Sequence, residues 1–125
     1  MSNSIFAEQF IREGASVVLC ARNAKELAAT RDELAKLAGA RQKIVAETCD
    51  VSSEAQVNEL VSFSLAELGS LQALVLNAGI FPVVPFEQTS LELWERTLAI
   101  NLTGSFLAAR RALPGTRPSR GSAPR

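Results

Sequence analysis

Histidine and tyrosine are both absent from the 125-residue sequence, and each absence removes a kind of chemistry. Without histidine, the chain has neither the commonest general base nor a serine–histidine triad. Without tyrosine, it has no phenolic hydroxyl to donate or accept a proton. Catalysis by this chain alone would therefore have to use other side chains.

Cysteine is scarce, since only Cys20 and Cys49 occur, each inside an apolar and β-prone run. A disulfide framework needs more cysteines, and a metal site needs closer spacing. The sequence therefore predicts two buried thiols in a reducing compartment and no metal site.

An excess of charge of one sign is also absent, because 13 basic and 13 acidic residues cancel. No net field favours nucleic acid or an anionic membrane as a partner. No apolar run approaches the ~20 residues that span a bilayer. Residues 1–4 lack the basic and apolar stretches of a signal peptide. We therefore expect a cytoplasmic protein without a membrane or nucleic-acid partner.

The sequence does contain an alternation of strand and helix patterns. Short, almost wholly apolar runs are typical of strands buried on both faces, whereas apolar residues three and four apart favour helices. Glycines and capping residues separate these segments. The alternation predicts a parallel sheet with helices on both faces. The expected strands are residues 16–21, 43–48 and 71–76, and the expected helices are residues 6–11, 24–38, 57–68, 93–98 and 102–113.

The composition changes abruptly after Leu113. Residues 114–125 contain three prolines, two glycines and three arginines, with no large apolar side chain. Such a segment cannot build a core, so we expect a globular part at residues 1–113 and a disordered, dispensable basic tail at 114–125. A nucleic-acid-binding arm is an alternative, although three charges give little phosphate affinity. A change of reading frame or exon is another.

Three short segments and one asparagine stand in order at the expected strand ends and helices. They are residues 6–23, Cys49-Asp50-Val51, Asn77-Ala78-Gly79 and Asn101. In this order and at this spacing they resemble the classical group of the short-chain dehydrogenase/reductase family, over residues 5 to about 113. The resemblance implies an α/β, Rossmann-like doubly wound parallel sheet. It also implies hydride transfer between NAD(P)(H) and a small carbonyl or alcohol substrate.

The resemblance assigns the residues after the first two strands to the cofactor. Arg22 lies where the family contacts the adenosine ribose, with Asn23 beside it. A guanidinium there binds the 2′-phosphate of NADP, whereas NAD-preferring sites place an acid, so NADP is expected over NAD. Asp50 resembles the residue that accepts from the adenine amino group, and Val51 lies beside the ring. The plainer alternatives are a solvated loop arginine and, for Asp50, a helix N-cap.

The later motifs are assigned to the cofactor turn and to catalysis. Asn77, Ala78 and Gly79 are small or polar residues that let the backbone pass close to the cofactor. Asn101 resembles the family's catalytic asparagine, which holds a water of a proton relay at a break between two helices. Taken alone, an asparagine at a helix junction is more often a cap.

The sequence departs from the family pattern at both ends. The family begins with a strand and a TGxxxGxG turn that binds the pyrophosphate, but residues 1–3 would occupy the last positions of that turn and include no glycine. Downstream, the family uses a Ser and then a YxxxK pair, whereas this chain has no tyrosine and its last lysine is Lys43. We therefore expect an incomplete fold without the first strand and the C-terminal half, weakened cofactor binding, and no complete active site.

Two consequences follow from the strand order 3-2-1-4-5-6. The absent first strand would lie between residues 16–21 and 71–76, so both segments should expose unpaired edges and the chain should be marginally stable and prone to association.

The main hypothesis is a truncated oxidoreductase of this family. The alternative is a non-catalytic module that associates with full-length family subunits or with itself; a free-standing nucleotide binder ranks last.

Overall fold

The centre of the computed structural model, which describes residues 2–116, is a two-stranded parallel sheet. Strand β1 (Val17–Ala21) pairs with β2 (Ile44–Thr48), in a register that sets Val17 opposite Ile44 and Ala21 opposite Thr48. Both strands lie within one residue of the expected runs. The predicted parallel α/β architecture is confirmed.

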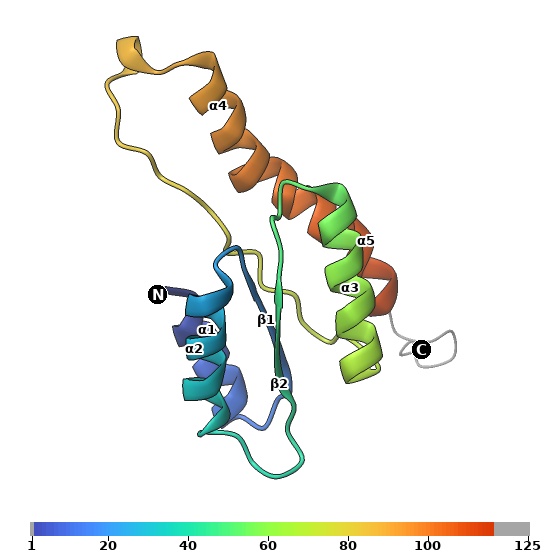
Figure 1. The fold of residues 1–125 in the computed structure, drawn as a ribbon. Helices are drawn as coiled ribbons and strands as arrows, with labels where there is room; N and C mark the ends of the chain where they lie inside the picture. The colour runs from blue at the N-terminus through green and yellow to red at the C-terminus, as the bar shows by residue number, and fades with distance from the viewer. Residues whose placement is uncertain (1, 117–125) are drawn as a thin grey trace, which may run out of the picture.

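One face of the sheet is covered by α1 (Ser2–Arg12) and α2 (Ala24–Ala35) (Figure 1). Their buried side chains form a small core with alternate residues of the strands. Gly14, at φ +93°, makes the turn from α1 toward β1 in a conformation that favours glycine. The buried members of this first cluster are Ala7, Ile11, Leu34 and Ile44.

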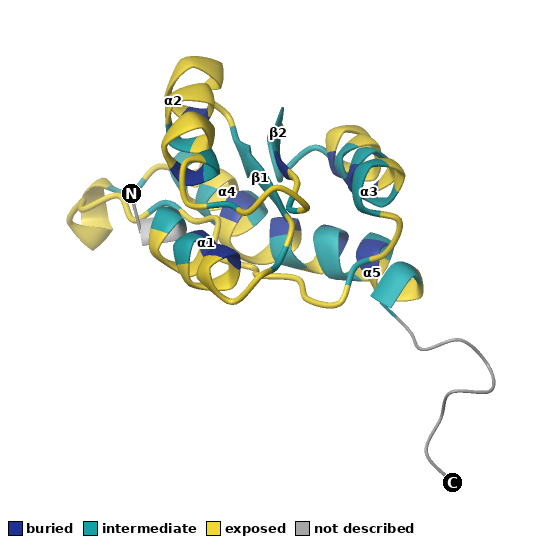
Figure 2. Ribbon diagram, turned by 90° about the horizontal axis from the view of Figure 1, so that it is seen from below, coloured by how far each residue is buried: buried dark blue, intermediate teal, exposed yellow. Residues whose placement is uncertain are grey.

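The opposite face is covered by α3 (Glu54–Leu68) and the C-terminal helix α5 (Gly104–Thr116), as the view in Figure 2 shows. Cys20 and Cys49 point to this side, where Cys49, Val57 and Leu107 form a second buried cluster. Successive strand residues point to opposite faces, so β1 contributes Val17 and Leu19 to the first cluster and Cys20 to the second. Helices on both faces make the sheet doubly wound.

A long helical rod runs from residue 91 to residue 116 (Figure 1). It consists of α4 (Leu91–Leu98), a π-helical turn η2 (Ala99–Thr103) and α5. The Ser90 hydroxyl caps α4 by accepting from the Leu93 amide at 3.1 Å, as expected of a serine at this position. A short 3₁₀ turn, η1 (Phe86–Gln88), precedes it.

The prediction of a third strand at residues 71–76 is wrong. This segment is irregular, and Leu74, Val75 and Leu76 are 42%, 50% and 46% exposed. An apolar run becomes a strand only when a neighbouring strand accepts and donates its backbone hydrogen bonds, and no such neighbour lies beside it in the described part of the chain. The segment has a β-prone sequence, but without a neighbouring strand it does not form a strand.

The last helix ends three residues later than the predicted end at Leu113. Helix α5 continues through Pro114 to Thr116, and a Cβ at Gly115 would lie 2.9 Å from a Leu65 methyl, so this last turn lies against α3. The rest of the predicted tail lies outside the described residues. Within residues 2–116, no helix is both long and apolar enough to cross a membrane.

Candidate functional site

The carboxyl ends of β1 and β2 bring Arg22 and Asp50 to the same edge of the sheet, because the strands are parallel and paired in register. The Asp50 carboxylate accepts from the Ser52 hydroxyl at 2.6 Å and from the Ser52 amide at 3.0 Å. These two bonds, with smaller contributions from the positive charges of Arg22 and Arg96, lower the pKa of Asp50. The carboxylate is therefore ionised at neutral pH and oriented as an acceptor.

The alternative in which Asp50 caps the following helix is wrong. The cap of α3 is Ser53, whose hydroxyl accepts from the Gln56 amide at 3.3 Å. The side chain of Gln56 in turn accepts from the Asp50 amide at 2.8 Å. The loop 50–53 is thus fixed by its own hydrogen bonds, which leaves the outer side of the Asp50 carboxylate available to a ligand.

Arg22 and Asn23 differ in what they already bind. Asn23 is the N-cap of α2 and accepts from the Glu26 amide at 3.0 Å, so its side-chain oxygen is engaged in holding the helix. Arg22 is exposed, and its guanidinium forms no ion pair or hydrogen bond within residues 2–116. Arg22 can therefore bind a ligand at the strand ends with its charged group, whereas the side-chain oxygen of Asn23 already binds the Glu26 amide.

Asn101 lies in the π-turn η2 and holds the backbone just after the Asn77-Ala78-Gly79 segment. Its side-chain carbonyl accepts from the Ile80 amide at 2.7 Å, and its side-chain NH₂ donates to the Ile80 carbonyl at 2.7 Å. Both of these bonds go to Ile80 and not to a helix amide, so Asn101 is not a helix cap. The start of η2 has no side-chain cap either. The break expected at this position is a π-turn, which widens the helix without interrupting it.

The Asn101 side chain lies very close to the turn, which explains why the motif has a glycine at residue 79. A Cβ at Gly79 would lie 3.3 Å from the Asn101 side-chain oxygen, tighter than an ordinary contact. Asn77, Ala78 and Gly79 are exposed. The structure thus supports the explanation of this motif by backbone geometry, whereas its contact with a cofactor stays a prediction.

A second contact of the same helix was not predicted. Gly104 begins α5, and a Cβ there would lie 3.0 Å from both the carbonyl oxygen and a methyl of Val51. Helix α5 therefore touches the loop after β2 only because residue 104 has no side chain. A glycine three residues after Asn101 was the available signal, but nothing local shows that its neighbour is Val51.

A groove of about 300 Å³ opens beside Asn101, between the loop after residue 79 and helix α4. Its polar members are satisfied internally: Thr97 donates to the Leu93 carbonyl, and Thr89 donates to the Pro85 carbonyl. The wall that remains is largely apolar. Ile80, Phe81, Pro82, Val84, Leu93 and Trp94 contribute to it.

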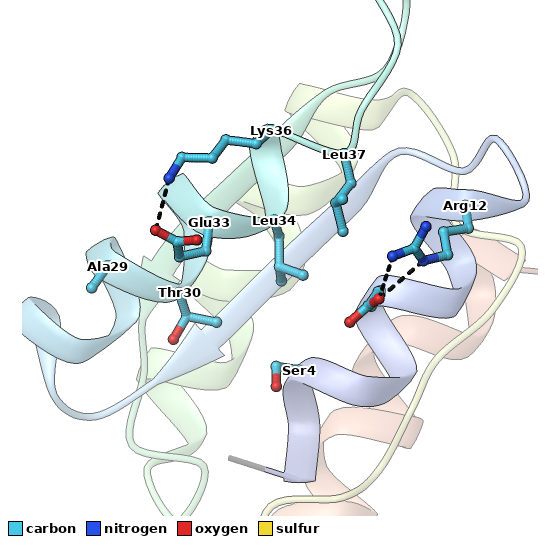
Figure 3. Close-up of a pocket in the computed structure, with 9 residues that line it drawn as sticks. Ser4, Arg12, Ala29, Thr30, Glu33, Leu34, Lys36 and Leu37 are labelled. Atoms are coloured by element: carbon cyan, nitrogen blue, oxygen red, sulfur yellow. Dashed lines mark hydrogen bonds and ion pairs between the residues drawn. The ribbon is translucent and has the colours of Figure 1, made fainter.

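A larger hollow of about 560 Å³ lies between α1 and α2, and Figure 3 shows the side chains around it. Two exposed ion pairs border it, Glu8 with Arg12 at 2.7 Å and Glu33 with Lys36 at 2.9 Å. None of the predicted site residues lines this hollow, so the candidate site remains at the strand ends.

The two thiols are structural. Burial raises the pKa of Cys20. Burial, followed by repulsion from the thiolate that Cys20 forms at high pH and from the Asp50 carboxylate, raises the pKa of Cys49 to about 11. Both thiols stay protonated at neutral pH and are poor nucleophiles. The described residues contain no group of three potential metal ligands among Cys, Asp and Glu.

The doubly wound sheet, with an arginine, a carboxylate and a glycine-containing turn at or near its carboxyl edge, defines the class of nucleotide-binding α/β proteins. Within this class, the chain belongs to the short-chain dehydrogenase family, whose sequence profile matches residues 4–123. The predicted family and the predicted Rossmann-like fold are confirmed.

Individual relatives agree with this assignment. The chain is 38% identical to glucose 1-dehydrogenase of Gluconobacter oxydans over 107 residues, which are 86% of this chain and 40% of that protein. A short-chain dehydrogenase from Mycobacterium smegmatis superimposes with a TM-score of 0.83 at 35% identity, over 90% of this chain and 46% of that one. A variant of actinorhodin polyketide ketoreductase solved with NADPH gives a TM-score of 0.83 at 29% identity, over 90% and 42% of the two chains. The chain thus spans about two fifths of the length of such relatives.

Proposed function

We propose that this chain forms the cofactor-binding portion of an NADP-preferring oxidoreductase that transfers hydride between the nicotinamide and a small carbonyl or alcohol substrate. The observation that carries the proposal is the bridge made by η2 and the start of α5. Asn101 holds the turn after Gly79, and one helical turn later Gly104 lies against Val51. One rigid element therefore sets the distance between two loops that would border a bound nucleotide.

Each site residue has a proposed part in this arrangement. Arg22 would bind the 2′-phosphate of NADP, and Asp50 would accept from the adenine amino group beside Val51. The turn 77–79 would pass close to the cofactor. Asn101, whose side chain uses one lone pair and one of its two N–H groups to bind Ile80, would also hold a water of a proton relay.

The sequence limits what the chain does by itself. It contains no tyrosine, and no lysine follows Lys43, so the YxxxK pair of the family is not in it. The pyrophosphate turn is not in it either. We therefore propose that the 125-residue chain binds the cofactor weakly and does not complete the reaction alone. We also propose that it is a cytoplasmic protein.

The cofactor assignment is tested by Arg22→Asp. We expect the wild-type chain to bind NADP more tightly than NAD, and the substitution to reduce the NADP/NAD affinity ratio about 10-fold or more, since a hydrogen bond to a charged group contributes about 1.5–3 kcal/mol. Titration calorimetry with both dinucleotides measures the ratio. Arg41→Asp, the same change at another exposed loop arginine, is the control and should leave the ratio unaltered. An unchanged ratio in Arg22→Asp would refute the assignment.

A second candidate function is association with full-length family subunits, and the surface of the helical rod favours it. Large apolar side chains recur three, four or seven residues apart along the rod and are 39–70% exposed. A stripe of this length on a monomer is typical of an interface. We call it the rod stripe; its residues are Leu91, Trp94, Leu98, Leu102, Phe106 and Leu113.

Gel filtration of the chain mixed with a full-length relative tests this candidate. A mixed complex should form, and Leu102→Glu should abolish it because a carboxylate would be buried at the centre of the rod stripe. Val83→Glu, at a site 87% exposed and outside the stripe, should leave the complex intact. Separate elution of the two wild-type proteins would exclude the association.

A further inference from the structure

Arg96, on helix α4, is a charged residue to which the sequence motifs assign no part. It is exposed, and its guanidinium forms no hydrogen bond or ion pair with the described part of the chain. Arg110, on the same helical rod, differs because it forms an ion pair with Glu54 of α3 at 2.7 Å. Arg96 therefore does not help to hold the rod against the other described elements.

The side of the rod on which Arg96 lies leads to the candidate site. Residues four apart on a helix lie on the same side, so Arg96, Ile100 and Gly104 follow one another along the rod. Ile100 is buried, and a Cβ at Gly104 would lie 3.0 Å from the Val51 carbonyl oxygen. Figure 1 shows α4 extending beyond the carboxyl ends of β1 and β2. Arg96 thus lies about two turns beyond the Val51 contact, on the side of the rod that meets the loop after β2.

The positive charge of Arg96 acts on the same carboxylate as that of Arg22. The hydrogen bonds from Ser52 are the largest cause of the lowered pKa of Asp50, and the charges of Arg22 and then Arg96 lower it further. Arg22 precedes α2 on one face of the sheet, whereas the rod packs beside α3 on the other face (Figure 2). Two guanidinium groups therefore approach the Asp50 carboxylate from opposite faces of the sheet.

We propose that Arg96 is a further cofactor-binding residue, whose guanidinium contacts the adenine base from the side of the sheet opposite to Arg22. The inference rests on the proposed function, in which Asp50 and Val51 hold the base. The side of the rod that carries Arg96 touches this loop, so the base is the part of the cofactor nearest to it. A guanidinium suits a purine because it stacks on aromatic rings and donates to ring nitrogens. The 2′-phosphate stays with Arg22.

Titration calorimetry of Arg96→Met with NADP and NAD tests this assignment. Methionine keeps an unbranched side chain but removes the charge and the N–H donors. We expect both dinucleotides to bind about 5-fold or more weakly, through loss of the contact between a cation and an aromatic ring. The NADP/NAD affinity ratio should not change, because both cofactors carry the same base. Arg41→Met, at an exposed loop arginine, is the control and should leave both affinities unaltered.

Adenosine supplies a second readout, because it contains the base and no phosphate. We expect Arg96→Met to weaken adenosine by the same factor as NADP, and Arg22→Asp to leave adenosine binding nearly unchanged. The amide signals of Val51 and Ser52 in NMR titrations measure this binding. If Arg96→Met has an altered circular dichroism spectrum, Arg96→Leu replaces it, since leucine also removes the charge and favours a helix.

Three outcomes would overturn the proposal. A wild-type chain that binds neither dinucleotide refutes the proposed function and this assignment with it. Unchanged affinities in Arg96→Met, in a chain whose NADP/NAD ratio responds to Arg22→Asp, refute the assignment of Arg96 alone. A lower NADP/NAD ratio in Arg96→Met, together with unaltered adenosine binding, would place Arg96 on the 2′-phosphate instead of the base.

Discussion

The purified 125-residue chain is expected to reduce no carbonyl substrate with NADPH or NADH, and to oxidise no alcohol with the corresponding oxidised cofactors. The sequence contains neither tyrosine nor histidine, so no side chain of those types can transfer the proton. A positioned acid or base contributes about 10²–10⁴-fold to a rate, and weak cofactor binding lowers the rate further. The change in nicotinamide absorbance, followed with a panel of sugars, alcohols and ketones, measures the activity.

A full-length relative with known sugar dehydrogenase activity, such as glucose 1-dehydrogenase, serves as the positive control in the same assay. Trace activity from a contaminating dehydrogenase would be unaffected by substitutions in this chain. Turnover that disappears with Asn101→Ala would contradict the prediction, because it would show that the chain itself completes a catalytic site.

Replacing Ile11 with alanine is expected to destabilise the chain by about 2–5 kcal/mol and to lower the urea midpoint of unfolding strongly. Ile11 is 1% exposed and belongs to a cluster of only four buried residues between α1, α2 and β2. Removing a buried isoleucine to alanine costs about 2–5 kcal/mol, and a whole domain is stable by only about 5–15 kcal/mol. A chain with two such small clusters has little margin to lose.

Urea titration followed by circular dichroism measures this effect. The control is Phe10→Ala, the adjacent residue on α1, which is 40% exposed and should shift the midpoint much less. If Ile11→Ala and Phe10→Ala shift the midpoint equally, the buried cluster does not hold α1 against the sheet.

Much of the fold follows from the sequence because it depends on neighbours along the chain. The runs that form β1 and β2 are short and apolar, and the helices before and after them show three- and four-residue spacing and end near glycines. Gly69, at φ +80°, ends α3 where the pattern stops. Such signals are local, so a single sequence contains them. The family motifs are also readable, since their order and spacing are properties of the chain.

The prediction failed at segment 71–76 for the opposite reason. Its sequence is as β-prone as those of β1 and β2, but a strand exists only when another strand supplies its hydrogen-bond partners. That partner is a property of the assembled sheet. The end of α5 was misplaced on similar grounds, because the contact of Gly115 with Leu65 helps to hold a turn that Pro114 alone would discourage.

The candidate site also has some features that the sequence predicts and others that only the structure shows. The sequence by itself determined the family, the Rossmann-like fold, the positions of Arg22 and Asp50 just past two strands, and that of Asn101 at the junction of two helices. Only the tertiary structure decided that Asn101 clamps the Ile80 peptide and that α5 touches Val51 through Gly104. These contacts join residues that are distant in sequence, and their geometry depends on how the helical rod lies against the sheet and its loops, which no local pattern specifies.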